Sequence, residues 1–142
     1  MAASAAIYGC QGMSLLPEER AFFRETRPWG FILFSRNCGE PRQLAALCDE
    51  LRSAIGCEAP IFIDQEGGRV ARLKPPHWPE RPAARRFGDV YRRSAENGRE
   101  AAYLGARLIA NDLRKLGITA NCAPVLGMPV PNRKSTRLNS SH

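Results

Sequence analysis

The chain has 142 residues, of which 44% are apolar, so it can bury the core of one domain, and wholesale disorder is excluded. Its net charge of +7 comes from arginines dispersed among acids, whereas nucleic-acid-binding proteins more often show a basic stripe. No apolar run approaches the roughly 18 residues that span a membrane, no secretory signal pattern opens the sequence, and five scattered cysteines fit neither a disulfide framework nor a zinc site.

From these features we expect a cytoplasmic protein with reduced thiols and with neither a nucleic-acid nor a membrane partner. Short apolar runs then alternate with amphipathic segments along the chain. An apolar stripe at helical spacing predicts the second helix, which Gly56 can end; the stripe consists of Leu44, Leu47, Cys48, Leu51 and Ile55. The elements predicted in the first half are strands at 5–9, 30–35 and 60–63 and helices at 17–26 and 40–56.

The second half begins with a loop, because residues 74–82 contain four prolines, which exclude a helix and a central strand. A long helix is predicted over residues 95–116, with Gly117 as its stop. Residues 118–126 are predicted as a fourth strand. The leucines and isoleucine expected to be available for burial on the long helix are Leu104, Leu108, Ile109, Leu113 and Leu116.

This alternation of strands and helices predicts an α/β fold with a parallel sheet and right-handed crossovers. Two architectures fit the order. An open doubly wound sheet often carries a glycine-rich dinucleotide fingerprint after its first strand, and the glycines at positions 9 and 12 match it poorly. A (β/α)8 barrel needs eight strands and about 250 residues. Since about four strands are visible, a barrel would require a truncated chain.

The sequence "FIDQEGGRVARL" at 62–73 places two acids, Asp64 and Glu66, directly after a buried strand. In an extended segment they would share one face with Cα atoms roughly 6.6 Å apart, a spacing compatible with the roughly 5–9.5 Å of glycosidase carboxylate pairs. Neighbours on one strand end, however, have little freedom to flank a scissile bond from two sides. This geometry argues against a catalytic pair.

The residues that follow the acids point to binding. Gly67 and Gly68 predict a sharp turn or a close backbone approach. Arg69 and Arg72 are near enough to pair with the acids, which would lower the carboxylate pKa values and favour the ionised forms. Ionised acids beside arginines suit hydrogen bonding to sugar hydroxyls; the alternative is an ion-pair network that only fixes the loop.

Three segments, "GFILFSRN", "PIFIDQEGGRVARL" and "NCAPVLGMPVP", resemble in order and spacing the N-terminal domain of glycoside hydrolase family 3. The resemblance is closest to the bacterial cytosolic β-N-acetylhexosaminidases. It implies that residues 1–131 are a partial family 3 barrel domain, the N-terminal half of a (β/α)8 TIM-type barrel. Residues 132–142 would then be a disordered tail foreign to the gene, the alternative being a natural flexible tail.

The resemblance also implies an activity. The whole enzyme would be a monomeric, retaining exo-glycosidase that removes terminal β-linked N-acetylglucosamine from muropeptides in cell-wall (peptidoglycan) recycling, without metal or organic cofactor. Asp64 and Arg72 would bind the terminal sugar. The turn behind them would be shaped by Glu66, Gly67, Gly68 and Arg69. The alternatives are a β-glucosidase-type member of the family and a non-catalytic sugar-binding module.

The family's catalytic residues, a nucleophilic Asp and a His–Asp acid/base pair, lie in later segments that this chain lacks. We therefore expect no catalytic residue here and an inactive chain. His77 in the proline-rich loop matches no family motif and is expected to pack beside Trp78. Gly127 stands where the family usually has Asp, which is a departure at the end of the fourth predicted strand.

Overall fold

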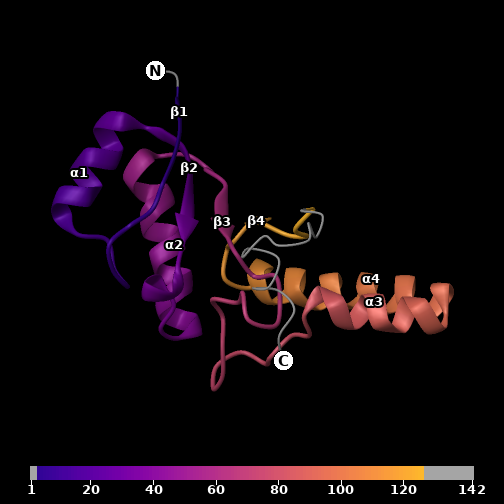
Figure 1. The fold of residues 1–142 in the computed structure, drawn as a ribbon. Helices are drawn as coiled ribbons and strands as arrows, with labels where there is room; N and C mark the ends of the chain where they lie inside the picture. The colour runs from indigo at the N-terminus through magenta and orange to yellow at the C-terminus, as the bar shows by residue number, and fades with distance from the viewer. Residues whose placement is uncertain (1–2, 127–142) are drawn as a thin grey trace, which may run out of the picture.

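The computed structural model describes residues 3–126, and it has the strand–helix alternation expected from the sequence (Figure 1). Gly127 and the 132–142 tail lie outside the described residues. The elements are β1 (Ser4–Tyr8), α1 (Pro17–Thr26), β2 (Pro28–Leu33), the short 3-10 helix η1 (Ser35–Asn37), α2 (Pro41–Ile55), β3 (Ile61–Ile63), α3 (Ala84–Arg93), α4 (Ala95–Arg114) and β4 (Ala120–Asn121).

The strands form one parallel sheet in the order β1-β2-β3-β4. Each strand therefore pairs with the next one along the chain, and the order never reverses. A doubly wound sheet reverses its strand order at a switch point, whereas a barrel adds strands sequentially. The sequential order thus decides between the two architectures in favour of the barrel type, with four of its strands present in residues 3–126.

The core lies between the sheet and α2. The five residues predicted as the apolar stripe of α2 are all buried, and Gly56 ends the helix in the left-handed conformation with φ 67°. They pack with Phe31 and Leu33 of β2 and with Ile61 and Ile63 of β3, which are fully buried. Burial of these side chains holds β3 against α2 and thereby positions the segment that follows β3.

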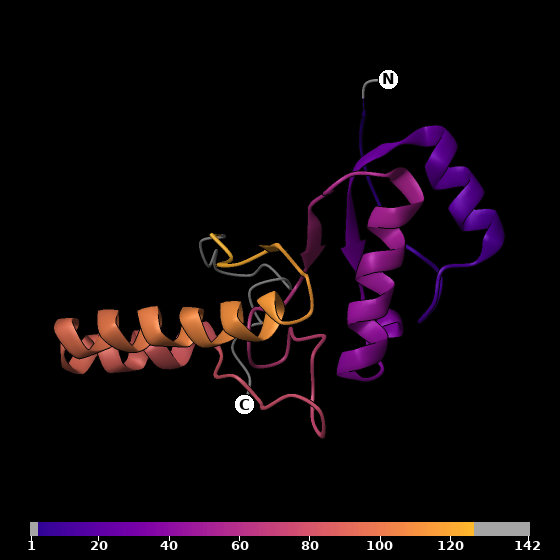
Figure 2. The same ribbon diagram turned by 180° about the vertical axis from the view of Figure 1, so that it is seen from behind.

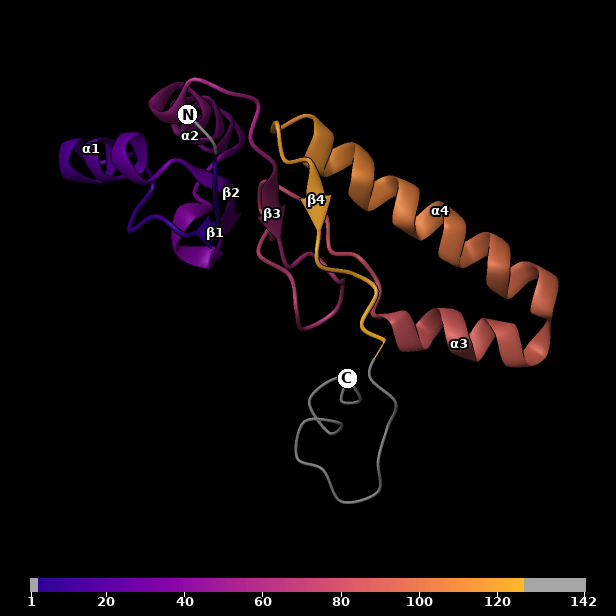
Figure 3. The ribbon, with the colours of Figure 1, turned by 90° about the horizontal axis from the view of Figure 1, so that it is seen from above.

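Helix α3 was not predicted. It packs against α4, and the two helices project together away from the sheet (Figures 2 and 3). This close approach requires glycine at position 98, since a Cβ atom there would lie 2.3 Å from the Cα of Tyr91. The sequence did not indicate this helix, because a proline-rich loop precedes α3 and Gly88 lies within α3.

Helix α4 covers most of the predicted range 95–116 but ends at Arg114. Ile109, Leu113 and Leu116 are buried as expected, whereas Leu104 and Leu108 are each 49% exposed, contrary to the expectation. The reason is geometric, because only the C-terminal half of α4 reaches the sheet (Figure 3). None of the helices within residues 3–126 is long and apolar enough to cross a membrane.

The fourth strand is much shorter than predicted, since β4 comprises only Ala120 and Asn121 of the predicted 118–126. Its register pairs Phe62 with Ala120 and Ile63 with Asn121. One further backbone bond, from the Cys122 N–H to the Ile63 carbonyl at 2.9 Å, extends the contact. Pro124 lacks an N–H and cannot continue such a ladder.

Candidate functional site

The candidate site begins where β3 ends. Ile63 is the last residue of β3, so Asp64 is the first residue beyond the strand, at the C-terminal edge of the sheet. Cys122 occupies the corresponding position after β4, beside it. The location predicted for Asp64 is therefore observed. In parallel α/β folds, ligands bind at this edge of the sheet.

An ion pair joins Asp64 to Arg72. The Nη2 of Arg72 donates to the Oδ2 of Asp64 at 2.7 Å, and the two side chains are 26% and 25% exposed. The chain reverses between them, because the Glu66 N–H donates to the Val70 carbonyl at 2.9 Å. The reversal brings a carboxylate and a guanidinium together at a surface that remains accessible.

Gln65 lies between the two acids and is almost fully buried, at 3% exposure. Its side-chain Oε1 accepts from the N–H groups of Arg72 and Leu73 at 2.8 and 3.0 Å, and its Nε2 donates to the Leu73 carbonyl at 3.2 Å. Sequence analysis missed this residue. The sequence did contain a signal for its burial. Every second residue of a strand faces the same side, and Gln65 continues the buried positions Ile61 and Ile63.

Gly67 and Gly68 form the turn that the sequence predicts. Both have positive φ, 91° and 62°. A Cβ atom on Gly67 would lie 2.3 Å from the Pro82 carbonyl oxygen, so the turn also requires a close backbone approach. The Gly68 N–H donates to the Arg81 carbonyl at 2.7 Å, which seats the turn on the end of the proline-rich loop.

That loop is in turn fastened to α4 by an ion pair. Arg81 donates to the Oδ2 of Asp112 through Nε at 3.1 Å and through Nη2 at 2.6 Å. Both side chains are largely buried, with 15% and 17% exposure. His77 lies exposed in the same loop, and its ring contacts Trp78, as expected.

The electrostatics of Glu66 differ from the expectation. Partial burial and the neighbouring negative charge of Asp64 raise the pKa of Glu66, and Arg72 offsets this only in part. The expected lowering of its pKa by the arginines is therefore wrong for Glu66, because desolvation is the larger effect. Arg69 is exposed, and the ion pair at this site is made by Arg72.

Cys122 belongs to the same electrostatic cluster. Although Cys122 is an exposed residue, partial desolvation raises the pKa of its thiol, and a hydrogen bond to Asp64 and the charges of Asp64 and Glu66 raise it further. These effects all favour the protonated thiol beside the carboxylate. Within residues 3–126, no three histidine, cysteine or acidic side chains gather as metal ligands.

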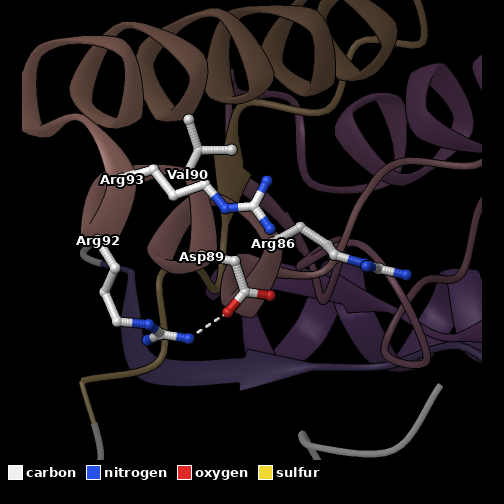
Figure 4. Close-up of a pocket in the computed structure, with 5 residues that line it drawn as sticks. All are labelled: Arg86, Asp89, Val90, Arg92 and Arg93. Carbon is white, nitrogen blue, oxygen red and sulfur yellow. Dashed lines mark hydrogen bonds and ion pairs between the residues drawn. The ribbon is translucent and has the colours of Figure 1, made fainter.

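A hollow of about 370 Å³ lies elsewhere, on α3, and Figure 4 shows its lining. None of the residues predicted from the sequence as site residues lines it. Its acid, Asp89, pairs with Arg92 of the same helix. The arrangement is that of a solvated, charged helix face, and the site residues predicted from the sequence lie instead around Asp64. The lining residues are Arg86, Asp89, Val90, Arg92 and Arg93.

Comparisons with known proteins agree on one group of relatives, although no family model matches the chain. A β-hexosaminidase of Thioalkalivibrio sulfidiphilus is 36% identical over 118 residues, which cover 83% of this chain and 34% of the relative. A β-hexosaminidase of Thiobacillus denitrificans is 34% identical over 82% of this chain and 32% of the relative. The chain thus spans about a third of the length of the curated relatives that it matches.

Solved structures show the same relationship. NagZ from Neisseria gonorrhoeae, crystallised with a zinc ion, superposes with a TM-score of 0.82 at 29% identity, covering 87% of this chain and 37% of NagZ. NagZ with N-trifluoroacetyl-D-glucosamine gives 0.80 at 27%, covering 86% and 35%. A glycoside hydrolase family 3 β-N-acetylglucosaminidase from Paenibacillus gives 0.73 at 34%, covering 83% and 22%.

Proposed function

We propose, from the premise that this chain is homologous to the N-terminal part of glycoside hydrolase family 3 enzymes, that it carries the sugar-binding part of a β-N-acetylhexosaminidase-type glycosidase. The observation that carries the proposal is the Asp64–Arg72 ion pair at the C-terminal edge of the sheet. The relatives are named β-hexosaminidases, and this supports hydrolysis of O-glycosyl bonds as the reaction of the whole enzyme. A β-glucosidase-type activity gains no support from them.

The pair is chemically suited to a sugar. A carboxylate accepts hydrogen bonds and a guanidinium donates them, whereas a hydroxyl does both. Neighbouring hydroxyls of one pyranose ring can therefore donate to Asp64 and accept from Arg72 at the same time. Charge-assisted hydrogen bonds of this kind are roughly twice as strong as neutral ones. The quarter exposure of both side chains leaves them accessible to such a ligand.

The turn behind the pair has a shaping role in this proposal. Gly67 and Gly68 permit the reversal, Glu66 hydrogen-bonds across it through its N–H, and exposed Arg69 lies at its surface. The finer substrate would be terminal β-linked N-acetylglucosamine of a muropeptide, cleaved with retention in the cytoplasm by a monomeric enzyme without a cofactor. A complex of NagZ with N-trifluoroacetyl-D-glucosamine supports the sugar class.

Hydrolysis would need groups beyond this pair. A retaining glycosidase uses two carboxyl groups on opposite sides of the bond. Asp64 is already paired with Arg72, and Glu66 follows it on the same side of one turn. We therefore assign no catalytic residue in this chain, and the 142-residue protein should bind sugar without cleaving it.

An activity assay tests this assignment. The purified 142-residue chain should release no 4-nitrophenol from 4-nitrophenyl N-acetyl-β-D-glucosaminide above the rate of its Asp64→Asn variant. Release by the chain that is lost in Glu66→Gln, with the fold retained, would make Glu66 catalytic and would overturn the assignment.

A further inference from the structure

The pairing of Arg72 with Asp64 depends on how Gln65 is placed, because the Gln65 side chain hydrogen-bonds to the backbone of Arg72 and Leu73. Gln65 itself lies beyond the end of β3, and the backbone register that pairs β3 with β4 does not include it. Its position must be fixed by some other contact.

Asn121 provides that contact. The Gln65 N–H donates to the Oδ1 of Asn121 at 2.9 Å, and the Nδ2 of Asn121 donates to the Gln65 carbonyl at 2.9 Å. One side-chain amide therefore supplies both a donor and an acceptor, as the peptide groups of a neighbouring strand would. The side chain in effect extends the β3–β4 ladder by one residue at the edge where Asp64 lies.

We propose that Asn121 is a positioning residue of the sugar site, which hydrogen-bonds the Gln65 peptide so that Gln65 places Arg72 against Asp64. The inference deepens the proposed function and rests on it. The hydrogen bonds run without a gap from the Asn121 amide to the Gln65 peptide, from the Gln65 side chain to the Arg72 N–H, and from the Arg72 guanidinium to Asp64.

This role is separable from strand pairing. The ladder between β3 and β4 also has backbone bonds, from the Thr119 N–H to the Ile61 carbonyl at 3.1 Å and from the Cys122 N–H to the Ile63 carbonyl at 2.9 Å. Loss of the Asn121 side chain leaves these intact. Loss of the side chain deprives buried Gln65 of two partners, and the effect should appear first at Arg72 and Leu73.

The experiment compares Asn121→Ala, Asn121→Asp and the control Asn111→Ala, which changes an exposed asparagine of α4. Asn121→Asp retains an acceptor for the Gln65 N–H but places a second oxygen against the Gln65 carbonyl. Backbone amide hydrogen exchange is followed by NMR in each 142-residue variant, without sugar. The dissociation constant for N-acetyl-D-glucosamine is then measured by titration.

In Asn121→Ala, exchange at Arg72 and Leu73 should rise about tenfold, and at least as much in Asn121→Asp, while Leu47 in the core and the whole of Asn111→Ala stay unchanged. The affinity for the sugar should fall about tenfold in parallel. Exchange that is unchanged, or that rises equally at Leu47, overturns the proposal. If the wild type binds no sugar, the proposed function fails, and the sugar-free exchange still decides whether Asn121 positions Arg72.

Discussion

Arg72 donates to Asp64 across 2.7 Å although the two residues lie eight positions apart in the chain. The partners come from a strand end and from the loop that returns to it. The site therefore depends on the geometry of one turn.

The turn requires glycine at position 67. Gly67→Ala should lower the free energy of unfolding by about 1–3 kcal/mol, since the residue has φ 91° and its Cβ would meet the Pro82 carbonyl. Gly88→Ala is the matched control, because a Cβ there meets nothing within 4 Å, and it should stabilise α3 by about 0.5–1 kcal/mol. Urea unfolding measures both, and equal effects would contradict the account.

The Arg81–Asp112 ion pair should contribute more than the ion pair on α3. A double-mutant cycle with Arg81→Gln and Asp112→Asn should give a coupling of about 1.5–3 kcal/mol, because the pair is largely buried and charge-assisted. The same cycle on Arg92 and Asp89, where the Arg92 side chain is 69% exposed, should give about 0.3–0.5 kcal/mol. Similar couplings in the two cycles would refute the structural role of Arg81.

The alkylation rate of Cys122 should depend on the charge of Asp64. Its thiol pKa is raised by burial first and then by Asp64, so little thiolate forms at pH 8 and alkylation by iodoacetamide should be slow. Asp64→Asn removes the neighbouring charge and should accelerate alkylation of Cys122 severalfold, as followed by mass spectrometry. Alkylation of Cys57, which is exposed as Cys122 is, serves as the internal control. An unchanged alkylation rate of Cys122 in Asp64→Asn would show that Asp64 does not influence the pKa of this thiol.

Glu66 should make stability depend on pH. Its pKa is raised in the fold by partial burial and by Asp64, so the native state binds the proton more tightly than the unfolded state does. The contribution of this group to stability is then present below its unfolded pKa and is lost as the pH rises through its folded pKa. Glu66→Gln should be more stable than wild type at pH 7 and should lose that advantage at acidic pH, as measured by thermal melts. The opposite sign would show that Glu66 is stabilised as an anion.

The sequence predicted those parts of the fold that depend on regular spacing of apolar residues or on residue type alone. The stripe of α2 and the glycine turn after β3 follow from spacing and from residue type, and both are observed. Helix α3 was missed because a proline-rich loop precedes it and Gly88 lies within it, and none of its residues is buried. Leu104 and Leu108 were expected to be available for burial but are exposed. Which part of α4 contacts the sheet is a tertiary property that the helical pattern does not give.

The site was predictable only in part, for a similar reason. Charged residues that follow a buried strand drew attention to this segment, whereas the choice of Asp64 and Arg72 as sugar-binding residues came from the family resemblance. Gln65 and Asn121 lie 56 residues apart, and their reciprocal hydrogen bonds depend on the register of β3 and β4. The raised pKa of Glu66 depends on burial, which residue types alone do not give.

The most direct test of the central claim is an NMR titration of the 142-residue chain with N-acetyl-D-glucosamine. The account predicts saturable shifts at Asp64, Gln65 and Arg72. Affinity should be about 10- to 100-fold lower in Asp64→Asn, which loses a charge-assisted hydrogen bond, and unchanged in the matched variant Asp89→Asn. An absence of shifts in the wild type, or equal affinity in wild type and Asp64→Asn, would contradict the assignment of a sugar site to Asp64 and Arg72.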